Sequence, residues 1–196
     1  MSVSVMSVSL ANRTLALLAG ASLVTLARAG VPDTTYTLLR KHSSLTYTFT
    51  QAGGANQGRF KTYAVSFDPA AGRLRVVIDM RSFDTGDGQR NGILGGKSFF
   101  DVAQYPRATF AASRLRKTAA GYRAVGRLTL RGVTRTVVVP FTWHLARVDG
   151  RRVGLLSGQT TIRRLNFGIG QGQWHSTEWV GNAVTVRFAL ELVPSG

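Results

Sequence analysis

Apolar and polar residues alternate along most of the chain after residue 34, which is the pattern of strands that bury one face. In the run LTYTFT, for example, Leu45, Tyr47 and Phe49 share one face and the threonines share the other. Alternating segments separated by turn residues predict strands at about residues 35–51, 57–68, 72–82, 107–116, 121–131, 135–147, 153–165 and 182–193. Such strands predict an all-β sandwich or barrel, and eight are enough to close a barrel around one ligand.

Residues 86–104 interrupt this alternation. The sequence DGQRNGILGGKSFFDV allows one or two short helical turns, because its four glycines disfavour a long helix. Phe99 and Phe100 are adjacent, and neighbouring residues of a strand point to opposite faces, so the two rings cannot both enter a core from a strand. On a loop or a helical turn they can point in different directions. The Tyr-Pro pair that follows favours extended backbone and a strand that begins at Arg107.

The first part of the chain contains the apolar run TLALLAGASLVTLARA, which ends in Ala27-Arg28-Ala29. Small residues at the first and third of these positions fit a signal-peptidase site. We therefore expect residues 1–29 to be a cleaved signal peptide and residues 30–196 to be one exported domain. A membrane anchor or a core helix is the alternative, but the run is short for a membrane span and no stop-transfer pattern follows it.

The formal net charge of the chain is +16, with 25 Lys and Arg residues against nine Asp and Glu residues. Removal of residues 1–29 takes away Arg13 and Arg28 and no acidic residue, which leaves +14. This balance favours anionic surfaces such as lipid headgroups or acidic polymers, or simply a basic, solvated exterior. The basic residues form no long run and no recognition-helix pattern, so nucleic acid is not expected as a partner.

Residues suited to catalysis are few in this chain. It has no cysteine, which excludes disulfides, zinc–thiolate sites and thiol catalysis. His42, His144 and His175 show no metal-ligand spacing, and no G-x-S-x-G motif occurs. We therefore expect no catalytic residue, no metal site and no enzymatic activity. The run Asp84-Thr85-Gly86 is interpreted as a turn or helix cap, and GIGQG lacks the lysine of a phosphate-binding loop.

Motifs that fit a known family occur in order along the chain: HSSLTYTF, GRF, FDP, IDMRSFDTG, SFFDVAQYPRATF, GRLTLRGVTRTVVVPF and RRLNFGIG. Together they resemble the YceI-like family, periplasmic lipid-binding proteins of Gram-negative bacteria, over about residues 34–193. The resemblance implies a lipocalin-like, eight-stranded antiparallel β-barrel with a short helical lid between strands 3 and 4. It implies no established catalytic activity and no required cofactor. Family members hold a polyprenyl phosphate, a ubiquinone-type tail or a fatty amide inside the barrel.

The resemblance also indicates where such a lipid would lie. We interpret residues 86–104 as the lid, with one phenylalanine ring in the core and the other nearer the opening. The barrel-lining and lid residues expected to contact the ligand are Tyr47, Phe49, Phe60, Val65, Phe67, Leu74, Val76, Ile78, Phe83, Ile93, Leu94, Phe99, Phe100, Phe110, Leu128, Val139, Phe141, Trp143, Phe167, Val186 and Phe188. Arg59, Arg90 and Arg131 are candidates for contact with a headgroup. Many relatives carry an acidic residue and a histidine after the lid arginine, whereas this chain reads RNGIL there.

The predicted function is therefore a periplasmic binding or carrier protein for an isoprenoid-type amphiphile, with transient contact with an anionic membrane surface. The alternatives are an electrostatic binder of anionic envelope polymers or of the membrane surface, and a lipid-modifying enzyme. The sequence leaves open whether the barrel interior is open or filled by side chains, and whether the protein forms a homodimer.

Overall fold

The computed structural model describes residues 34–195, so the predicted signal peptide lies outside the described residues. The strands are β1 (Tyr36–Gln51), β2 (Gly54–Phe60), β3 (Tyr63–Asp68), β4 (Arg73–Asp79), β5 (Phe83–Asp84), β6 (Arg107–Thr118), β7 (Gly121–Leu130), β8 (Val133–Val148), β9 (Arg151–Arg163) and β10 (Val180–Pro194). The helices are α1 (Gly88–Gly95) and the 3₁₀ turns η1 (Met80–Ser82), η2 (Arg164–Phe167) and η3 (Gly172–His175). Within residues 34–195, none of these helices combines the length and the apolarity that crossing a membrane requires.

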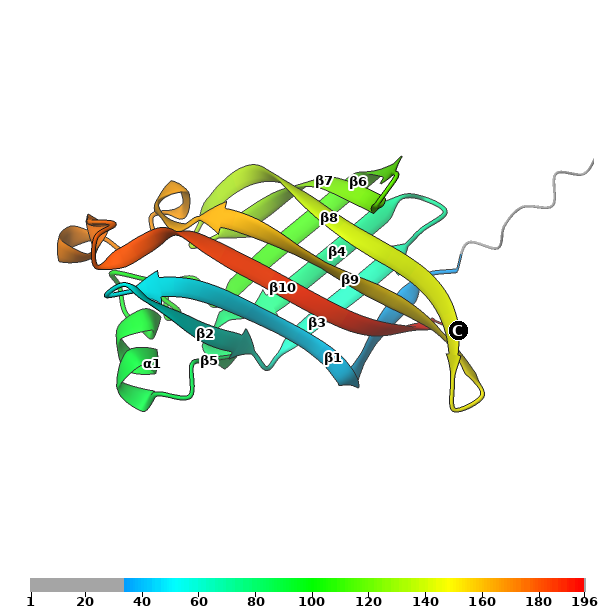
Figure 1. Cartoon of the computed structure of the whole chain (residues 1–196), viewed down its shortest axis with the longest axis horizontal. Helices are drawn as coiled ribbons and strands as arrows, with labels where there is room; N and C mark the ends of the chain where they lie inside the picture. Colours follow the sequence, from blue (N-terminus) through cyan, green and yellow to red (C-terminus); the bar gives the residue numbers. More distant parts are fainter. Residues whose placement is uncertain (1–33, 196) are drawn as a thin grey trace, which may run out of the picture. The chain divides into compact units, whose positions relative to one another are not determined.

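The strands form one closed antiparallel barrel (Figure 1). Neighbouring strands follow the order β10, β9, β8, β7, β6, β4, β3, β1, and pairing of β10 with β1 closes this ring of eight. β2 and β3 share one position in the ring, because β1 pairs with β3 near its start and with β2 near its end. The two-residue β5 pairs with β2. The predicted eight-stranded antiparallel barrel is therefore confirmed.

The predicted strand 57–68 is wrong in one respect, because it is two strands. At the junction, the backbone N–H groups of Lys61 and Thr62 donate to the carbonyl and hydroxyl oxygens of Ser82, both at 3.0 Å. Short polar side chains that bond nearby backbone compete with a strand ladder. Ser82 is twenty residues away in sequence from Thr62, so alternation within the segment could not reveal the break.

The predicted strand 72–82 is also shorter than expected, since β4 ends at Asp79. The Asp79 carboxylate accepts a hydrogen bond from the Arg81 N–H at 3.0 Å and so caps η1. The other six predicted strands agree with the observed strands within two residues at each end.

The barrel has two different ends. The lid end carries α1, which connects the β4 side of the barrel to β6, and the segment from η2 to η3. The hairpin end carries the turns that join β3 to β4, β6 to β7 and β8 to β9, with the β8–β9 hairpin at the right of Figure 1. The short helix predicted within residues 86–104 is confirmed, and β6 begins at Arg107 as predicted. The carboxylate of Asp87 accepts the Arg90 N–H at 3.0 Å and caps α1.

An aromatic plug fills the barrel near the hairpin end. It consists of Tyr36, Phe67, Tyr122, Phe141 and Trp143, whose rings meet mostly edge to face. The centroids of Phe67 and Trp143 lie 4.8 Å apart and those of Tyr36 and Trp143 lie 5.0 Å apart. The Trp143 ring lies over Gly154 of β9, in space that a Cβ atom would occupy. A second buried cluster at the lid end joins η1, α1 and the η2 segment through Met80, Leu94, Phe99, Ala108, Leu130, Phe167 and Ile169.

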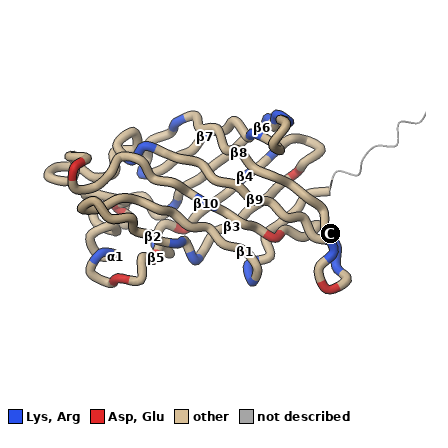
Figure 2. The backbone as a smooth tube through the Cα atoms, in the orientation of Figure 1, with Lys and Arg blue, Asp and Glu red and all other residues tan. Residues whose placement is uncertain are grey.

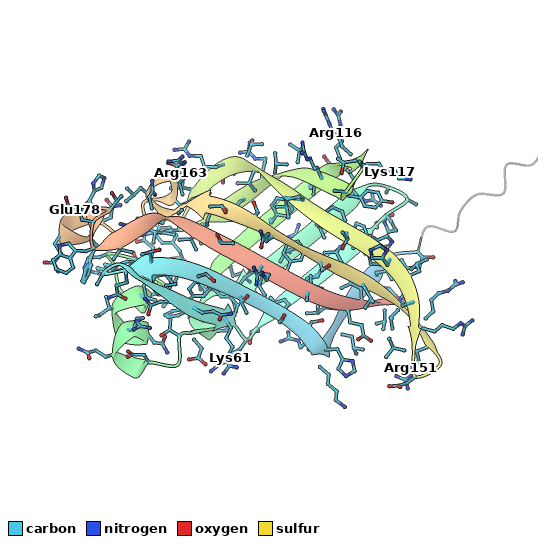
Figure 3. The ribbon with its side chains drawn as sticks, viewed as in Figure 1. Lys61, Arg116, Lys117, Arg151, Arg163 and Glu178 are labelled. Atoms are coloured by element: carbon cyan, nitrogen blue, oxygen red, sulfur yellow. The ribbon has the colours of Figure 1, made fainter. Side chains whose placement is uncertain are left out.

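Charged residues are spread along the strands and around both ends of the barrel (Figure 2). Lys61, Arg116, Lys117, Arg151 and Arg163 all project away from the barrel (Figure 3). Among residues 34–195 Arg164 is the one buried basic residue, so most of the positive charge lies on the exterior.

Candidate functional site

An apolar cavity of about 170 Å³ lies inside the barrel between the aromatic plug and the lid. Its wall includes residues from all eight strands of the ring and from α1, the lid segment and the η2 segment. Most wall residues are aliphatic or aromatic, and the polar members are Tyr47, Tyr63, Thr160 and Arg164. A dry apolar cavity of roughly 150 Å³ is large enough for a benzene-sized group. The interior therefore holds a ring-sized or short aliphatic segment without rearrangement.

The alternating pattern identifies most of the wall. The structure brings together around the cavity the predicted residues Tyr47, Phe49, Phe60, Val65, Leu74, Val76, Ile78, Leu94, Phe99, Phe100, Phe110, Leu128, Val139, Val186 and Phe188. The strand residues among them meet because every second residue of a barrel strand points inward. Leu94, Phe99 and Phe100 reach the cavity from α1 and the lid segment instead.

Six other predicted residues do not line the cavity. Phe67, Phe141 and Trp143 belong to the aromatic plug, and Phe167 lies in the buried lid-end cluster. Phe83 packs against Phe100 from outside the cavity wall, with ring centroids 5.3 Å apart.

Ile93 is the sixth, and its side chain is 43% exposed on α1. Strand alternation shows which residues face inward, but it does not show how far along the axis the interior is filled. For a residue of a short helix, such as Ile93, strand alternation does not show whether the side chain points into the barrel or into solvent.

The structure adds wall residues that were not predicted: Leu45, Tyr63, Met80, Ala108, Leu130, Val137, Leu156, Thr160, Ile162, Arg164, Ile169, Val180, Val184 and Leu190. Leu45, Val184 and Leu190 lie on the same alternating faces as predicted residues, so the pattern contained the signal for them. Arg164 and Ile169 lie in or beside the irregular η2 turn, where no periodic signal exists.

The two adjacent phenylalanines of the lid segment point in different directions, as expected. Phe99 is buried, and its ring packs on Trp174 with centroids 5.5 Å apart. Phe100 is half-buried and packs on Phe83. Asp101 follows with a left-handed backbone (φ 48°), and its N–H donates to the Gly96 carbonyl at 3.0 Å. Both rings line the cavity, so the lid segment forms part of the wall.

Arg164 is a buried guanidinium that organises the η2 segment. Its Nη1 donates to the Ile169 carbonyl at 2.8 Å, and its Nη2 donates to the Trp174 and Val180 carbonyls at 2.8 and 2.7 Å. Its Nε donates to the Gly181 carbonyl at 3.1 Å. Burial lowers the pKa of this guanidinium. One side chain therefore ties together the backbone of the loop that covers part of the lid end.

The three arginines proposed for a headgroup do not line the cavity. Arg59 pairs with Asp84 at 3.1 Å, and Arg90 lies 3.7 Å from Asp87. Arg131 donates to the Lys97 carbonyl at 2.8 Å. The structure gives each of them an intramolecular partner instead.

Asp84 joins the barrel to the lid. Its Oδ1 accepts the Gly86 N–H at 2.9 Å, as expected for a turn, and the Asn91 amide at 3.3 Å. Its Oδ2 pairs with Lys61 at 3.0 Å as well as with Arg59. The Gly86 N–H, followed by Lys61 and Arg59, holds the pKa of this carboxyl well below its usual range.

Asn91 occupies α1 just after the lid arginine. Its Oδ1 accepts hydrogen bonds from the Thr85 N–H at 3.0 Å and the Thr85 hydroxyl at 2.8 Å. Its side chain therefore fixes the approach to α1 by neutral hydrogen bonds. Among residues 34–195 there is no group of three or more His, Asp or Glu side chains placed to hold a metal ion.

Comparison with known proteins gives a consistent picture of the fold. A family model described as the YceI-like domain matches residues 36–192. Relatives in sequence include a UPF0312 protein of Yersinia pestis, 41% identical over 87 residues, which are 42% of this chain and 45% of that protein. The matched region thus spans less than half of this curated relative.

Solved structures of similar fold include BcnA of Burkholderia cenocepacia, with a TM-score of 0.70 and 34% identity over 79% of this chain and 98% of that chain. A polyisoprenoid binding domain from Saccharophagus degradans has a TM-score of 0.64 and 19% identity, covering 82% of this chain and 98% of that one. The YCEI protein of Campylobacter jejuni has a TM-score of 0.62 and 25% identity, covering 71% and 84%.

Proposed function

Because this chain belongs to the YceI-like family, we propose that it binds and carries an isoprenoid-type amphiphile in the periplasm, with the apolar tail inside the barrel. The observation that carries this proposal is the apolar cavity between the lid and the aromatic plug. The polyisoprenoid binding described for the Saccharophagus degradans domain, which shares the fold, supports the same ligand class.

Apolar burial supplies the binding free energy in such a site. Each methylene group that leaves water contributes about 0.8 kcal/mol, so a long tail needs a tunnel more than it needs polar contacts. This explains how the chain can bind a lipid without a prominent polar motif. Ligand pockets for larger molecules usually have volumes of roughly 300–1,000 Å³. A full isoprenoid tail therefore requires the wall to widen, and the half-buried Phe60 and Phe100 are the large rings with room to move.

The test is extraction of bound lipid from the mature protein purified out of its native host. Mass spectrometry of the organic extract should show a prenyl lipid or a fatty amide in near-stoichiometric amount. Val137 and Val138 give a matched pair of variants, since Val137 lines the cavity and Val138 is 47% exposed on the other face. Val137→Phe should reduce the bound lipid and Val138→Phe should leave it unchanged. Repeated absence of lipid from folded wild-type protein contradicts the proposal.

Contact with an anionic membrane surface is the second part of the proposal, and the hairpin end supports it. Arg116 lies directly opposite Arg123 in the β6–β7 ladder, and Arg147 lies directly opposite Arg152 in the β8–β9 ladder. Like charges in this position destabilise a sheet, and an anionic surface relieves the repulsion. Leu145 on β8 is 57% exposed beside them and adds an apolar contact.

Vesicle sedimentation tests this contact. The protein should bind vesicles that contain phosphatidylglycerol and should not bind purely zwitterionic vesicles, and salt should weaken the binding. Replacing the Arg147/Arg152 pair by Ser should reduce vesicle binding more than replacing Arg75 and Arg127 together, two exposed arginines on the barrel side that face Ser66 and Thr136 across their ladders. Equal loss in both variants would show that net charge alone, and not the hairpin end, governs the contact.

A further inference from the structure

The hydroxyl oxygen of Tyr47 is enclosed in the cavity wall without a hydrogen-bond partner. The side chain is only 4% exposed. Buried tyrosine hydroxyls normally have a partner, because an unpaired polar group loses its hydrogen bonds to water and gains none. The cavity presents no polar surface, so neighbouring atoms cover this hydroxyl in the lipid-free protein, and widening of the wall around a ligand would uncover a donor that still needs a partner.

The position of this hydroxyl is fixed by its surroundings. Tyr47 lies directly opposite Gly58 in the β1–β2 ladder, and its ring occupies the space where a Cβ atom of residue 58 would be. Phe60 and Phe49 hold the ring from either side, with centroids 5.1 and 6.1 Å from that of Tyr47. The glycine opposite the ring and the two aromatic neighbours therefore define where the hydroxyl lies.

The hydroxyl is a donor over the whole neutral range of pH. Burial raises the pKa of Tyr47, and the Asp84 carboxylate raises it further, while the Arg90 guanidinium acts in the opposite direction. The group therefore stays protonated, and its free O–H can donate to an acceptor oxygen. The strand pairing puts Tyr47 on the lid side of the barrel: it lies opposite Gly58 of β2, and Phe60 of β2 pairs with Phe83 of β5 in the lid connection.

Of the three other polar residues of the wall, Tyr63, Thr160 and Arg164, the last two are already engaged. Thr160 donates its hydroxyl hydrogen to the Val138 carbonyl at 3.1 Å. The guanidinium of Arg164 is surrounded by backbone carbonyls, which take up its N–H groups. A phosphate inside the cavity would therefore find neither the Arg164 guanidinium nor the Thr160 hydroxyl free to bind it. A neutral carbonyl needs only one O–H donor.

We propose that the Tyr47 hydroxyl binds the polar group of the lipid, and that this group is a neutral hydrogen-bond acceptor, such as the carbonyl oxygen of an amide, ester or quinone ring. The polar group then lies under the lid and the tail runs toward the aromatic plug. This inference rests on the proposed function, and it narrows the ligand class within it.

Matched probes test the inference. Stearamide carries a carbonyl, and octadecane has the same chain length without one. Displacement of a fluorescent apolar probe gives the affinity of each for the wild-type protein and for Tyr47→Phe. The substitution should weaken stearamide binding roughly five- to tenfold, which is the loss of one hydrogen bond, and should leave octadecane binding unchanged. Tyr105→Phe is the matched control and should change neither affinity, because Tyr105 packs on Gly132 and does not line the cavity.

Thermal unfolding of the lipid-free variant gives an independent readout. If the hydroxyl has no partner in the protein, Tyr47→Phe leaves the melting temperature unchanged or raises it, because a buried unpaired group is removed. A lower melting temperature would show that the hydroxyl bonds to the protein itself and would overturn the inference.

The outcomes separate the two proposals. If the folded wild-type protein binds neither stearamide nor octadecane, lipid binding fails and the inference fails with it. If the wild type binds both probes and Tyr47→Phe changes neither affinity, or both equally, lipid binding stands and the role of Tyr47 is wrong. Tighter binding of stearyl phosphate than of stearamide would overturn the neutral class of headgroup.

Discussion

The ring of Phe99 lies 5.5 Å from the ring of Trp174, which joins the lid segment to the loop that follows β9. The same two segments are joined by backbone hydrogen bonds, since the N–H groups of Gly170 and Gln171 donate to the Ser98 carbonyl at 2.7 and 2.8 Å. The lid end is thus closed by two segments that are distant in sequence. A ligand that enters there must separate them or move the side chains between them.

The two lid phenylalanines should differ when each is truncated. Phe99 is buried in the lid-end core, so Phe99→Ala should lower the free energy of unfolding by about 3–5 kcal/mol. Phe100 is half-buried yet lines the cavity, so Phe100→Ala should destabilise the fold much less and should still speed the release of lipid. Denaturant unfolding and probe release measure the two effects. Unchanged release per folded molecule in Phe100→Ala would show that this ring only fills the core.

Loss of the Arg164 guanidinium should loosen the loop that it organises. Arg164→Gln leaves several buried carbonyls without a donor, and the expected loss in free energy of unfolding is about 3 kcal/mol. Amide hydrogen exchange should rise mainly between residues 165 and 181. Arg163→Gln is the control, because Arg163 projects into solvent (Figure 3), and it should change neither quantity. Uniformly faster exchange across the barrel would contradict a local role.

The barrel and most of its lining follow from a single repeated feature of the sequence. Alternation places Tyr47, Phe110 and Val139 inside because a barrel strand points every second residue inward. It fails where a side chain from elsewhere in the chain replaces the ladder, as the Ser82 hydroxyl does at Thr62. It also cannot show how far the interior is filled, which is why the plug residues Phe67 and Trp143 were expected to touch the ligand.

Arg164 shows a second limit of the sequence pattern. A charged residue at the end of a strand is usually exposed to solvent. The RRLNFG motif contains two adjacent arginines, and nothing in the neighbouring sequence shows which of them is buried. Arg163 is exposed and Arg164 is buried because the carbonyls of residues 169–181 surround only the second. The carbonyl groups that accept from Arg164 belong to an irregular loop. The conformation of this loop depends on Arg164 itself, so the sequence pattern could not predict it.

The lid helix contains a glycine that limits its stability. Gly92 lies in the middle of α1, and a Cβ atom there would meet no neighbouring atom within 4 Å. Gly92→Ala should stabilise α1 by up to about 1 kcal/mol, because alanine loses less backbone entropy in a helix. If opening of the lid includes fraying of α1, Gly92→Ala should slow lipid release by a few-fold. The affinity of the protein for an alkane should stay the same. Stopped-flow release and the melting temperature check both parts. A stabilised helix with unchanged release would place the exit route elsewhere.

The Asp84 junction should make stability depend on pH in a defined direction. Its pKa in the folded state lies well below the value of about 3.9 for an unfolded aspartate. A lowered folded-state pKa means that the stabilisation is fully present above pH ~4 and is lost as the pH falls from there toward the folded-state pKa. Asp84→Asn should therefore be less stable than wild type at neutral pH, and the difference should shrink below pH ~4. Asp149→Asn, in the exposed β8–β9 turn, is the control variant measured over the same pH range. The Asp84 carboxylate also accepts a hydrogen bond from the Asn91 amide of α1. Amide hydrogen exchange in α1 should therefore become faster over the same acidic range. Constant protection of α1 there would disprove the link between this carboxylate and the lid.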